Sequence, residues 1–346
     1  MIYSQSKDFI LTASKAGWSE QDIAYAIKYS ARLSQSGLPT IFDVRHLSVL
    51  SGFKRDFLYR AANGQNKFYR KFSVKKRDGS ERQLVEPLPD LKEFQSWLAD
   101  SVGSKLPVSK YVHSYRPGRS IKTNARFHLG KKVVVRLDVK DFFASTKLGA
   151  VEKVLLSCGY TSSVSRILAS LTTLNGALPQ GAPSSPSLSN AIYISLDNKL
   201  GSYALENNWH YTRYADDLTF SGSGSPRSLI SFVENSLKDE ELELNESKIR
   251  VMRRGSRQVS CGVILNECLG PSREMRRTFL QEVHFVRKFG LAGHIDRKGI
   301  ETSDYISTLI GRGNHILWMM AQHPNRLPPF QEALSFLKSV EIESRS

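Results

Sequence analysis

Acidic residues stand at two places in the chain where buried strands are expected. Asp138 ends the β-branched run KKVVVRLD at 131–138, and Asp216-Asp217 interrupts an alternating apolar pattern over 211–221. Because adjacent carboxylates repel each other and lose hydration on burial, each place needs a positive counter-charge. Paired Asp residues in a hairpin are also ordinary turn residues, so neither place defines a site by itself.

The two places form one site if their strands are neighbours in a sheet. Asp138, Asp216 and Asp217 would then converge, and three carboxylates can hold two Mg²⁺ ions because hard oxygen ligands suit that cation. Two such ions activate a 3′-hydroxyl and steady a leaving pyrophosphate, which is the minimum for nucleotidyl transfer. Asp141 is expected to point elsewhere on the strand and to pair with a surface base.

The elements that must position these residues are a mixture of helices and strands. Ser19 can cap a helix that opens a small helical part reaching to about residue 66. A hairpin is expected with its turn at Asp78-Gly79. A boundary is expected at Pro271-Ser272. Helices are expected over 91–106, 184–205 and 273–289. The fold class that follows is α+β.

Size and charge narrow the function classes. The 346 residues, 40% of them hydrophobic, are enough for two or three packed subdomains and more than a binding module usually needs. The net charge of +16 points to a polyanionic partner. Residues 248–298 carry twelve basic and four acidic side chains, which is half of that surplus, although a solvated helix face is the simpler explanation of such a run.

The remaining composition argues against a membrane or disulfide-bonded protein. The chain has no long apolar run and no signal-peptide pattern, so a soluble cytoplasmic protein is expected. Cys158, Cys261 and Cys268 form no CxxC pair, which favours reduced, buried thiols over a zinc site.

Together these motifs resemble the palm of reverse transcriptases. The resemblance rests on Tyr-Ala-Asp-Asp at 214–217, on the strand-ending Asp138 and on the loop LPQGAPSSP at 178–186. Asn124-Ala-Arg-Phe-His128 matches the NAxxH motif of bacterial retron enzymes, and the resemblance covers about residues 55–320. It implies a right-hand polymerase fold with an antiparallel palm sheet. The implied parts are a helical extension (1–66), fingers (67–130), palm (131–266) and helical thumb (267–346).

The resemblance implies roles for further residues. The implied dNTP contacts are Lys76, Arg82, Phe143, Gln180, Gly181 and Lys248. Phe143 would exclude a ribose 2′-hydroxyl, unless it packs in the core with Phe142; one of these two strand neighbours must face outward. Lys248 would protonate the leaving pyrophosphate or simply bind phosphate. Gly181 would allow a close backbone approach.

A second implied group would contact RNA. The thumb helix is expected to bury Met275, Phe279, Val283 and Val286 in one stripe. The basic residues implied as template contacts around that stripe are Arg273, Arg276, Arg277, Arg287 and Lys288. The family's VTG motif appears here as Ser260-Cys261-Gly262, with only the glycine kept, which leaves the RNA subtype open.

Asn124, His128 and Gly262 are implied in the choice of RNA. Their distance in sequence from the Asp residues predicts that they lie apart from the carboxylates and leave the chemistry unaffected. The alternative is that Asn124 and His128 only brace the fingers against the palm.

The implied activity is RNA-directed DNA synthesis by a retron enzyme. Such an enzyme binds a cognate structured non-coding RNA, primes from a guanosine 2′-hydroxyl and yields branched RNA-linked single-stranded DNA (msDNA). The resemblance also implies anti-phage defence with a separate effector protein. The rivals are a group II intron-like or abortive-infection reverse transcriptase, and an RNA-binding scaffold that restrains a toxic effector.

Overall fold

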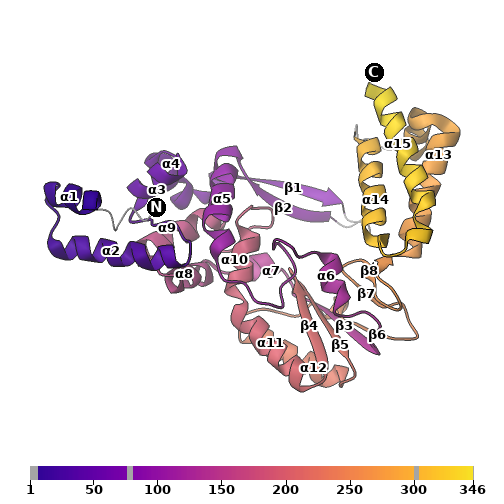
Figure 1. Ribbon diagram of the computed structural model, residues 1–346, viewed down its shortest axis with the longest axis horizontal. Helices are drawn as coiled ribbons and strands as arrows, with labels where there is room; N and C mark the ends of the chain where they lie inside the picture. Colours follow the sequence, from indigo (N-terminus) through magenta and orange to yellow (C-terminus); the bar gives the residue numbers. More distant parts are fainter. Residues whose placement is uncertain (1–6, 76–80, 300–303, 346) are drawn as a thin grey trace. The chain divides into compact units, whose positions relative to one another are not determined.

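The chain divides into two compact units. A computed structural model describes residues 7–75, 81–299 and 304–345 (Figure 1). The first unit consists of Met1–Tyr115, Val139–Leu200 and Phe232–Leu244, and the second of Arg116–Asp138, Gly201–Ser231 and Asn245–Ser346. Helices mixed with antiparallel sheets confirm the expected α+β class.

The first unit begins with helices, as predicted. They are α1 (Lys7–Lys15), α2 (Glu20–Gln35), α3 (Val44–Ser51) and α4 (Arg55–Asn63), followed by the 3₁₀ turn η2 (Gln65–Phe68). Ser19 caps α2: its hydroxyl oxygen accepts a hydrogen bond from the Asp22 amide at 3.1 Å. The cap satisfies an amide at the start of α2 that has no partner within the helix.

A two-stranded hairpin follows the helices. β1 (Tyr69–Lys75) and β2 (Glu81–Pro87) pair antiparallel, with Phe72 opposite Leu84. This confirms the strands expected from the sequence. The Asp78-Gly79 turn lies outside the described residues.

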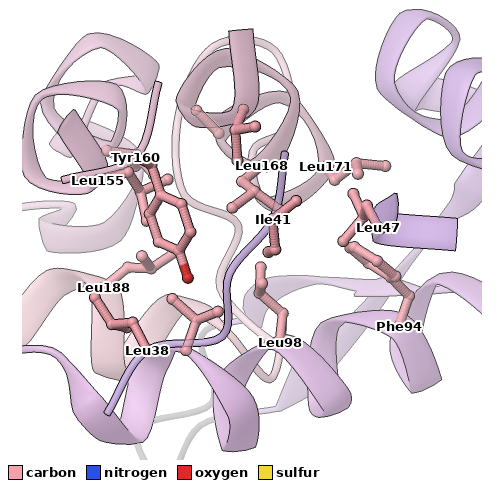
Figure 2. Packing of buried hydrophobic residues seen from close by; sticks show 14 of the residues in the cluster. Leu38, Ile41, Leu47, Phe94, Leu98, Leu155, Tyr160, Leu168, Leu171 and Leu188 are labelled. Atoms are coloured by element: carbon pink, nitrogen blue, oxygen red, sulfur yellow. The ribbon is translucent and has the colours of Figure 1, made fainter. Parts of the chain in front are cut away.

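The core of the first unit is made by helices from distant parts of the chain. They are α5 (Pro89–Ser101), the 3₁₀ turn η3 (Gly103–Lys105), α7 (Phe142–Ser145), α8 (Leu148–Ser157), α9 (Ser162–Thr172) and α10 (Ser185–Ile192). Figure 2 shows Ile41, Leu98 and Leu168 pointing toward one another within this core. Each fully buried leucine contributes about 1.5–3 kcal/mol to stability. This packing joins the N-terminal helices to the 148–192 region.

One expected helix is interrupted. The sequence predicts a continuous helix over 184–205, whereas α10 ends at Ile192, Tyr193 caps it, and α11 (Ile194–Glu206) begins after that residue. Tyr193 has φ −93° and ψ 21°, its ring packs on Phe142, and its hydroxyl lies 2.9 Å from Thr146 Oγ1. The break lets Tyr193 make these tertiary contacts, which the apolar period of the sequence does not reveal.

The second unit contains a four-stranded antiparallel sheet in the order β4-β5-β3-β6. Its strands are β3 (Val133–Asp138), β4 (Trp209–Tyr214), β5 (Asp217–Gly222) and β6 (Arg250–Arg253). β3 and β5 each bury successive residues, so both faces of the sheet are covered. The short helix α6 (Ile121–Arg126) precedes β3, the 3₁₀ turn η4 (Glu246–Lys248) precedes β6, and α12 (Pro226–Lys238) continues from the second unit into the first.

A small sheet and a helical bundle complete the second unit. The sheet comprises β7 (Val259–Ser260), β8 (Val263–Ile264) and β9 (Gly270–Pro271). The bundle comprises α13 (Arg273–Lys298), α14 (Tyr305–Met320), the turn η5 (Pro324–Arg326) and α15 (Pro328–Arg345), whose helices lie alongside one another (Figure 1).

The predicted apolar stripe of α13 does form the core of this bundle. Phe279, Val283 and Val286 are buried there, and Met275 packs against them. Gly290 interrupts α13 with φ 72° and ψ 167°, where the sequence places the end of its basic helix. Within the described ranges, no helix has the length and apolar character needed to cross a membrane.

Candidate active site

The acidic residues of the two sequence motifs meet in the central sheet. β3 and β5 pair antiparallel with Asp138 directly opposite Asp217, so the two side chains share one face of the sheet. Tyr214 pairs with Asp217, which leaves Ala215-Asp216 as a two-residue hairpin loop. Ala215 has a left-handed φ of 56°, an uncommon conformation for a residue with a side chain. The predicted adjacency of the two strands is confirmed.

Asp138 is buried and already paired with a cation. Its side chain is 9% exposed, and the Lys248 ammonium lies 2.7 and 2.9 Å from its two carboxylate oxygens. Asn245 Nδ2 donates to Oδ1 at 3.3 Å, and the Asn245 amide donates to the Asp138 carbonyl oxygen at 2.8 Å. These backbone and side-chain bonds hold the η4 turn, and with it Lys248, against the end of β3.

Asp217 is held in a less favourable environment for a charge. Burial raises its pKa to about 6; the nearby Arg136 opposes that rise, and the Asp216 and Asp138 charges add to it. Arg136 Nε lies 3.7 Å from Asp217 Oδ1. Arg136 was not among the residues expected at the site. The available signal was its position two before Asp138, because residues two apart on a strand face the same side.

The turn between β7 and β8 also reaches the carboxylates. Cys261 Sγ lies 4.0 Å from Asp217 Oδ2, and burial raises the Cys261 pKa to about 12, which keeps the thiol neutral. Cys261 and Gly262 have φ of 46° and 80°, the pair of positive angles that a type I′ turn requires. The glycine retained from the VTG motif therefore serves this turn. The expectation that this segment lies apart from the carboxylates is wrong, since tertiary folding closes the sequence gap.

Asn124 and His128 lie inside the protein. Both side chains are 0% exposed. Asn124 Nδ2 donates to Ser260 Oγ at 3.1 Å, while the two ring nitrogens of His128 lie 2.7 Å from the hydroxyls of Ser221 and Thr212. Neither side chain has surface to offer RNA in this structure. Their hydrogen bonds instead join α6 and its C-terminal end to β4, β5 and β7, which agrees with the bracing alternative but with different partners.

The LPQG loop lies against the β1–β2 hairpin. The Gln180 carbonyl oxygen accepts a hydrogen bond from the Val85 amide at 3.1 Å. Gly181 has φ 125°, and a Cβ there would lie 2.8 Å from the Val85 carbonyl oxygen. The predicted close backbone approach is therefore an approach to β2. The Gln180 side chain remains exposed.

The two basic residues expected in the hairpin are only partly described. Arg82 lies opposite Val74 in the β1–β2 ladder. Lys76 lies outside the described residues.

Phe142 and Phe143 lie on a helical turn and not on a strand. β3 ends at Asp138 and α7 begins at Phe142, after Asp141 with φ 46°. The strand argument for their orientation is therefore wrong. Phe142 is 4% exposed and Phe143 only partly buried, so the helix still leaves Phe143 accessible.

The basic residues of α13 differ in exposure. Arg273, Arg277, Arg287 and Lys288 are exposed, while Arg276 is half-buried. The Arg287 guanidinium lies 4.8 Å from the centre of the Phe336 ring, so its stem is fixed against α15.

The carboxylates of Asp138 and Asp217 are the ligand type that Mg²⁺ prefers, but basic side chains of the protein already lie beside them. Over residues 7–75, 81–299 and 304–345, no three His, Cys, Asp or Glu side chains are already arranged around a common metal position. Lys248 occupies the cation position at Asp138, and Arg136 lies beside Asp217. Carboxylates that are buried together and require cationic partners fit a divalent ion by charge and by donor type.

Comparisons with known proteins agree with these motifs. A family model described as "Reverse transcriptase (RNA-dependent DNA polymerase)" matches residues 74–281. The retron Mx65 reverse transcriptase of Myxococcus xanthus is 38% identical, over 73% of this chain and 65% of that protein. The retron Mx162 reverse transcriptase of the same organism is 34% identical, over 72% and 59%. The retron Ec86 reverse transcriptase of Escherichia coli is 30% identical, over 74% and 81%. The chain thus spans about 65% and 59% of the two Myxococcus proteins.

Solved structures show a more distant likeness. Apo telomerase from Candida tropicalis aligns with a TM-score of 0.41 at 12% identity, covering 78% of this chain and 58% of that chain. The foamy viral protease-reverse transcriptase in complex with double-stranded DNA aligns with a TM-score of 0.38 at 13% identity, covering 79% and 45%.

Proposed function

Given that this chain belongs to the reverse transcriptase family, and within it to the retron enzymes, we propose that it is an RNA-directed DNA polymerase. The observation that carries the proposal is the strand register that sets Asp138 opposite Asp217 at the tip of the Tyr-Ala-Asp-Asp hairpin. Carboxylates in this arrangement suit the transfer of a deoxynucleotide to a hydroxyl group.

The family uses divalent metal ions, and Asp138, Asp216 and Asp217 are the residues that would hold two Mg²⁺. When bound, the ions supply Lewis-acid activation of the attacking hydroxyl and neutralise charge on the leaving pyrophosphate. The fit is supported by the buried Asp138 carboxylate and by the raised pKa of Asp217, because both groups gain from a nearby positive charge.

Lys248 has two tasks in this proposal. Its ammonium neutralises Asp138 before the reaction and, once released, donates a proton to the leaving pyrophosphate. Arg136 stays beside Asp217 and limits the rise of that carboxyl's pKa. Lys248 and Arg136 thereby balance the negative charges of Asp138 and Asp217 when no substrate is bound.

Substrate selection is assigned to residues around the nucleotide. Phe143 fills the space that a ribose 2′-hydroxyl would need, and Gln180 contacts the incoming base or sugar from its exposed position. Gly181 acts by holding the Gln180 backbone on β2. Lys76 and Arg82 grip the triphosphate from the hairpin, Arg as a fork and Lys as a point charge.

The template is a cognate structured non-coding RNA, in keeping with the retron relatives. The α13–α15 bundle serves as thumb, and its exposed arginines and Lys288 follow the RNA backbone through charge and shape. The product is branched msDNA primed from a guanosine 2′-hydroxyl. We place the ribonucleoprotein in anti-phage defence with a separate effector chain.

Primer extension tests the proposed role of the carboxylates in DNA synthesis. Asp216→Asn plus Asp217→Asn should abolish DNA synthesis with Mg²⁺ and dNTPs while RNA binding persists. Asp90→Asn plus Asp100→Asn, both exposed on α5, removes the same charge and should leave extension unchanged. Extension by the first variant would disprove the assignment.

The retron role is tested separately by sequencing the nucleic acid that co-purifies with the protein. A structured RNA covalently joined to DNA through a guanosine supports the proposal. Intron RNA or untemplated DNA would favour the group II or abortive-infection alternatives. RNA without any DNA product would favour a scaffold.

A further inference from the structure

The second unit contains a pocket of about 250 Å³ beside the small sheet β7–β9. Its apolar lining is Ile264, Leu269, Pro271 and Met320. Its cationic and titratable lining is Arg257, Arg273, Arg276, Arg326 and His323. Cys268 also lines the pocket. A pocket lined by both apolar side chains and guanidinium groups suits a ligand with one flat apolar part and one anionic part.

The cationic surface continues outside this pocket. A neighbouring recess of about 500 Å³ shares Arg257 and Arg273 and adds Arg277. Glu274 contributes the one carboxylate among the described residues that line either hollow. The described residues that line the two hollows thus carry five guanidinium groups and one carboxylate, so the local electrostatic potential attracts anions.

Within the part of the chain that the structure describes, these guanidinium groups have no ion-pair partner. In the described ranges, none of the five arginines lies within ion-pair distance of a carboxylate. Arg276 Nε and His323 Nε2 are buried and have no hydrogen-bond partner in those ranges. A buried donor without a partner is unfavourable, and an anionic acceptor entering the pocket would remove that penalty.

We propose that this pocket binds one unpaired nucleotide of the RNA held by the enzyme. The nucleotide's phosphate lies among Arg273, Arg276 and Arg326, and its base lies against the apolar lining of Ile264, Leu269, Pro271 and Met320. This inference rests on the proposed function, because RNA is taken as the bound polymer. The bound nucleotide is unpaired, because a base in a duplex has both faces covered by its stacked neighbours and cannot lie against the apolar lining. Arginine planes and apolar side chains are surfaces on which an unstacked base can lie.

Cys268 provides a direct probe of the pocket. The full chain is treated with iodoacetamide, and alkylation of each cysteine is followed by peptide mass spectrometry. Cys158, in the first unit, is the internal control for general changes in reactivity. The added ligands are a short single-stranded oligouridylate, a self-complementary RNA duplex, AMP and inorganic phosphate.

The single-stranded RNA and AMP should slow alkylation of Cys268, whereas the duplex and inorganic phosphate should not. Arg276→Gln plus Arg326→Gln should need about a hundredfold more RNA for equal protection, because two charge-assisted hydrogen bonds, each worth about tenfold, are lost. Arg45→Gln plus Arg55→Gln removes the same charge from exposed positions on α3 and α4 and should leave protection unchanged.

Three results would overturn the inference: no protection of Cys268, equal protection by inorganic phosphate, or equal protection by the duplex. The first means that the pocket binds no RNA, the second that it binds phosphate alone, and the third that it follows a duplex backbone. Primer extension run in parallel separates the two proposals. Extension without protection rejects the pocket alone, and protection without extension rejects the polymerase assignment alone.

Discussion

The Lys248 ammonium lies within hydrogen-bond distance of both carboxylate oxygens of Asp138, at 2.7 and 2.9 Å. One residue proposed for proton transfer is thereby bound to one residue proposed to hold metal. Because a cation and the ammonium compete for the same oxygens, metal binding at Asp138 and release of Lys248 are expected to be one event.

Replacement of Lys248 should expose that competition. Lys248→Gln is expected to lower stability without metal by about 1–3 kcal/mol, because it leaves the buried Asp138 carboxylate without its cationic partner. Mg²⁺ should then stabilise the variant more than the wild type, since no ammonium has to be displaced. Thermal unfolding with and without MgCl₂ measures both effects. Lys199→Gln, which removes a surface pair with Asp239 at 2.7 Å, is the control. Equal stabilisation of wild type and Lys248→Gln would contradict the competition.

Asp217 should make the metal-free protein less stable at high pH. Its pKa in the folded state is about 6, above the ordinary value of 3.8, so the folded state binds this proton more tightly than the unfolded state does. The contribution of Asp217 to stability therefore increases as the pH falls from about 6 to about 4.

Asp217→Asn removes the buried charge and should raise the free energy of unfolding by roughly 2–3 kcal/mol near pH 8 in metal-free buffer, and by much less near pH 4. Urea unfolding at the two pH values measures it. Asp100→Asn, at an exposed site, should give no such difference. A gain that does not depend on pH would disprove the assignment to Asp217.

Gly181 should tolerate no side chain. Gly181→Ala places a Cβ 2.8 Å from the Val85 carbonyl oxygen at a backbone φ of 125°, and should cost about 1–3 kcal/mol. Because the contact is with backbone, relief requires the LPQG loop to leave β2. Gly149→Ala, in helix α8 with open space around it, should instead be neutral or stabilising by up to about 1 kcal/mol. Chemical unfolding of both variants makes the comparison, and an equal effect would refute the close-approach argument.

Substitution of Phe143 should change the choice of nucleotide sugar, whereas substitution of Phe142 should change stability. Phe143→Ala is expected to admit ribonucleotides, seen as a smaller preference for dGTP over GTP in steady-state extension. Phe142→Ala should mainly destabilise the protein, by about 3–5 kcal/mol, because Phe142 is buried against Tyr193. An unchanged nucleotide preference in Phe143→Ala would make Phe143 a packing residue.

Substitution of Asn124 and His128 should reduce DNA synthesis on every RNA template, because it destabilises the protein. In the double variant Asn124→Ala, His128→Ala, the buried hydroxyls of Ser221 and Thr212 lose their His128 partner, at a cost of about 1–3 kcal/mol for each group left unpaired. Ser260 loses Asn124 but keeps the Thr219 hydroxyl at 2.9 Å. Extension on a DNA primer annealed to generic RNA and on the cognate RNA should fall together with the melting temperature. Ser228→Ala, at an exposed position, is the control. A loss confined to cognate RNA would restore their role in RNA choice.

The sequence predicts those features that depend on local chain chemistry. The strand ending at Asp138 follows from its β-branched run, and the cap at Ser19 follows from capping preference. The end of the basic helix at Phe289 agrees with the non-helical Gly290. Each of these depends on residues within a few positions of one another.

Features that depend on tertiary contacts were missed. Separation by more than forty positions predicts that Gly262 lies away from the carboxylates, yet the side chain of its neighbour Cys261 lies 4.0 Å from Asp217. Tyr193 breaks a helix that its period predicts to continue, because its hydroxyl pairs with Thr146. Arg136 could have been placed beside the site from strand alternation, but only the structure gives its partner, Asp217.

The central sheet also determines when the site can form during synthesis. Its strands come from 133–138, 209–222 and 250–253, so the carboxylate at the end of β3 is made long before Lys248. A nascent chain that stops short of residue 248 contains Asp138, Asp216 and Asp217 but lacks both the lysine and the β6 edge. Because chains emerge from the N-terminus and distant strand pairs form slowly, the sheet is expected to close late on the ribosome. Ribosome-bound chains that end before β6 should therefore be more sensitive to protease in β3 than chains that extend past it.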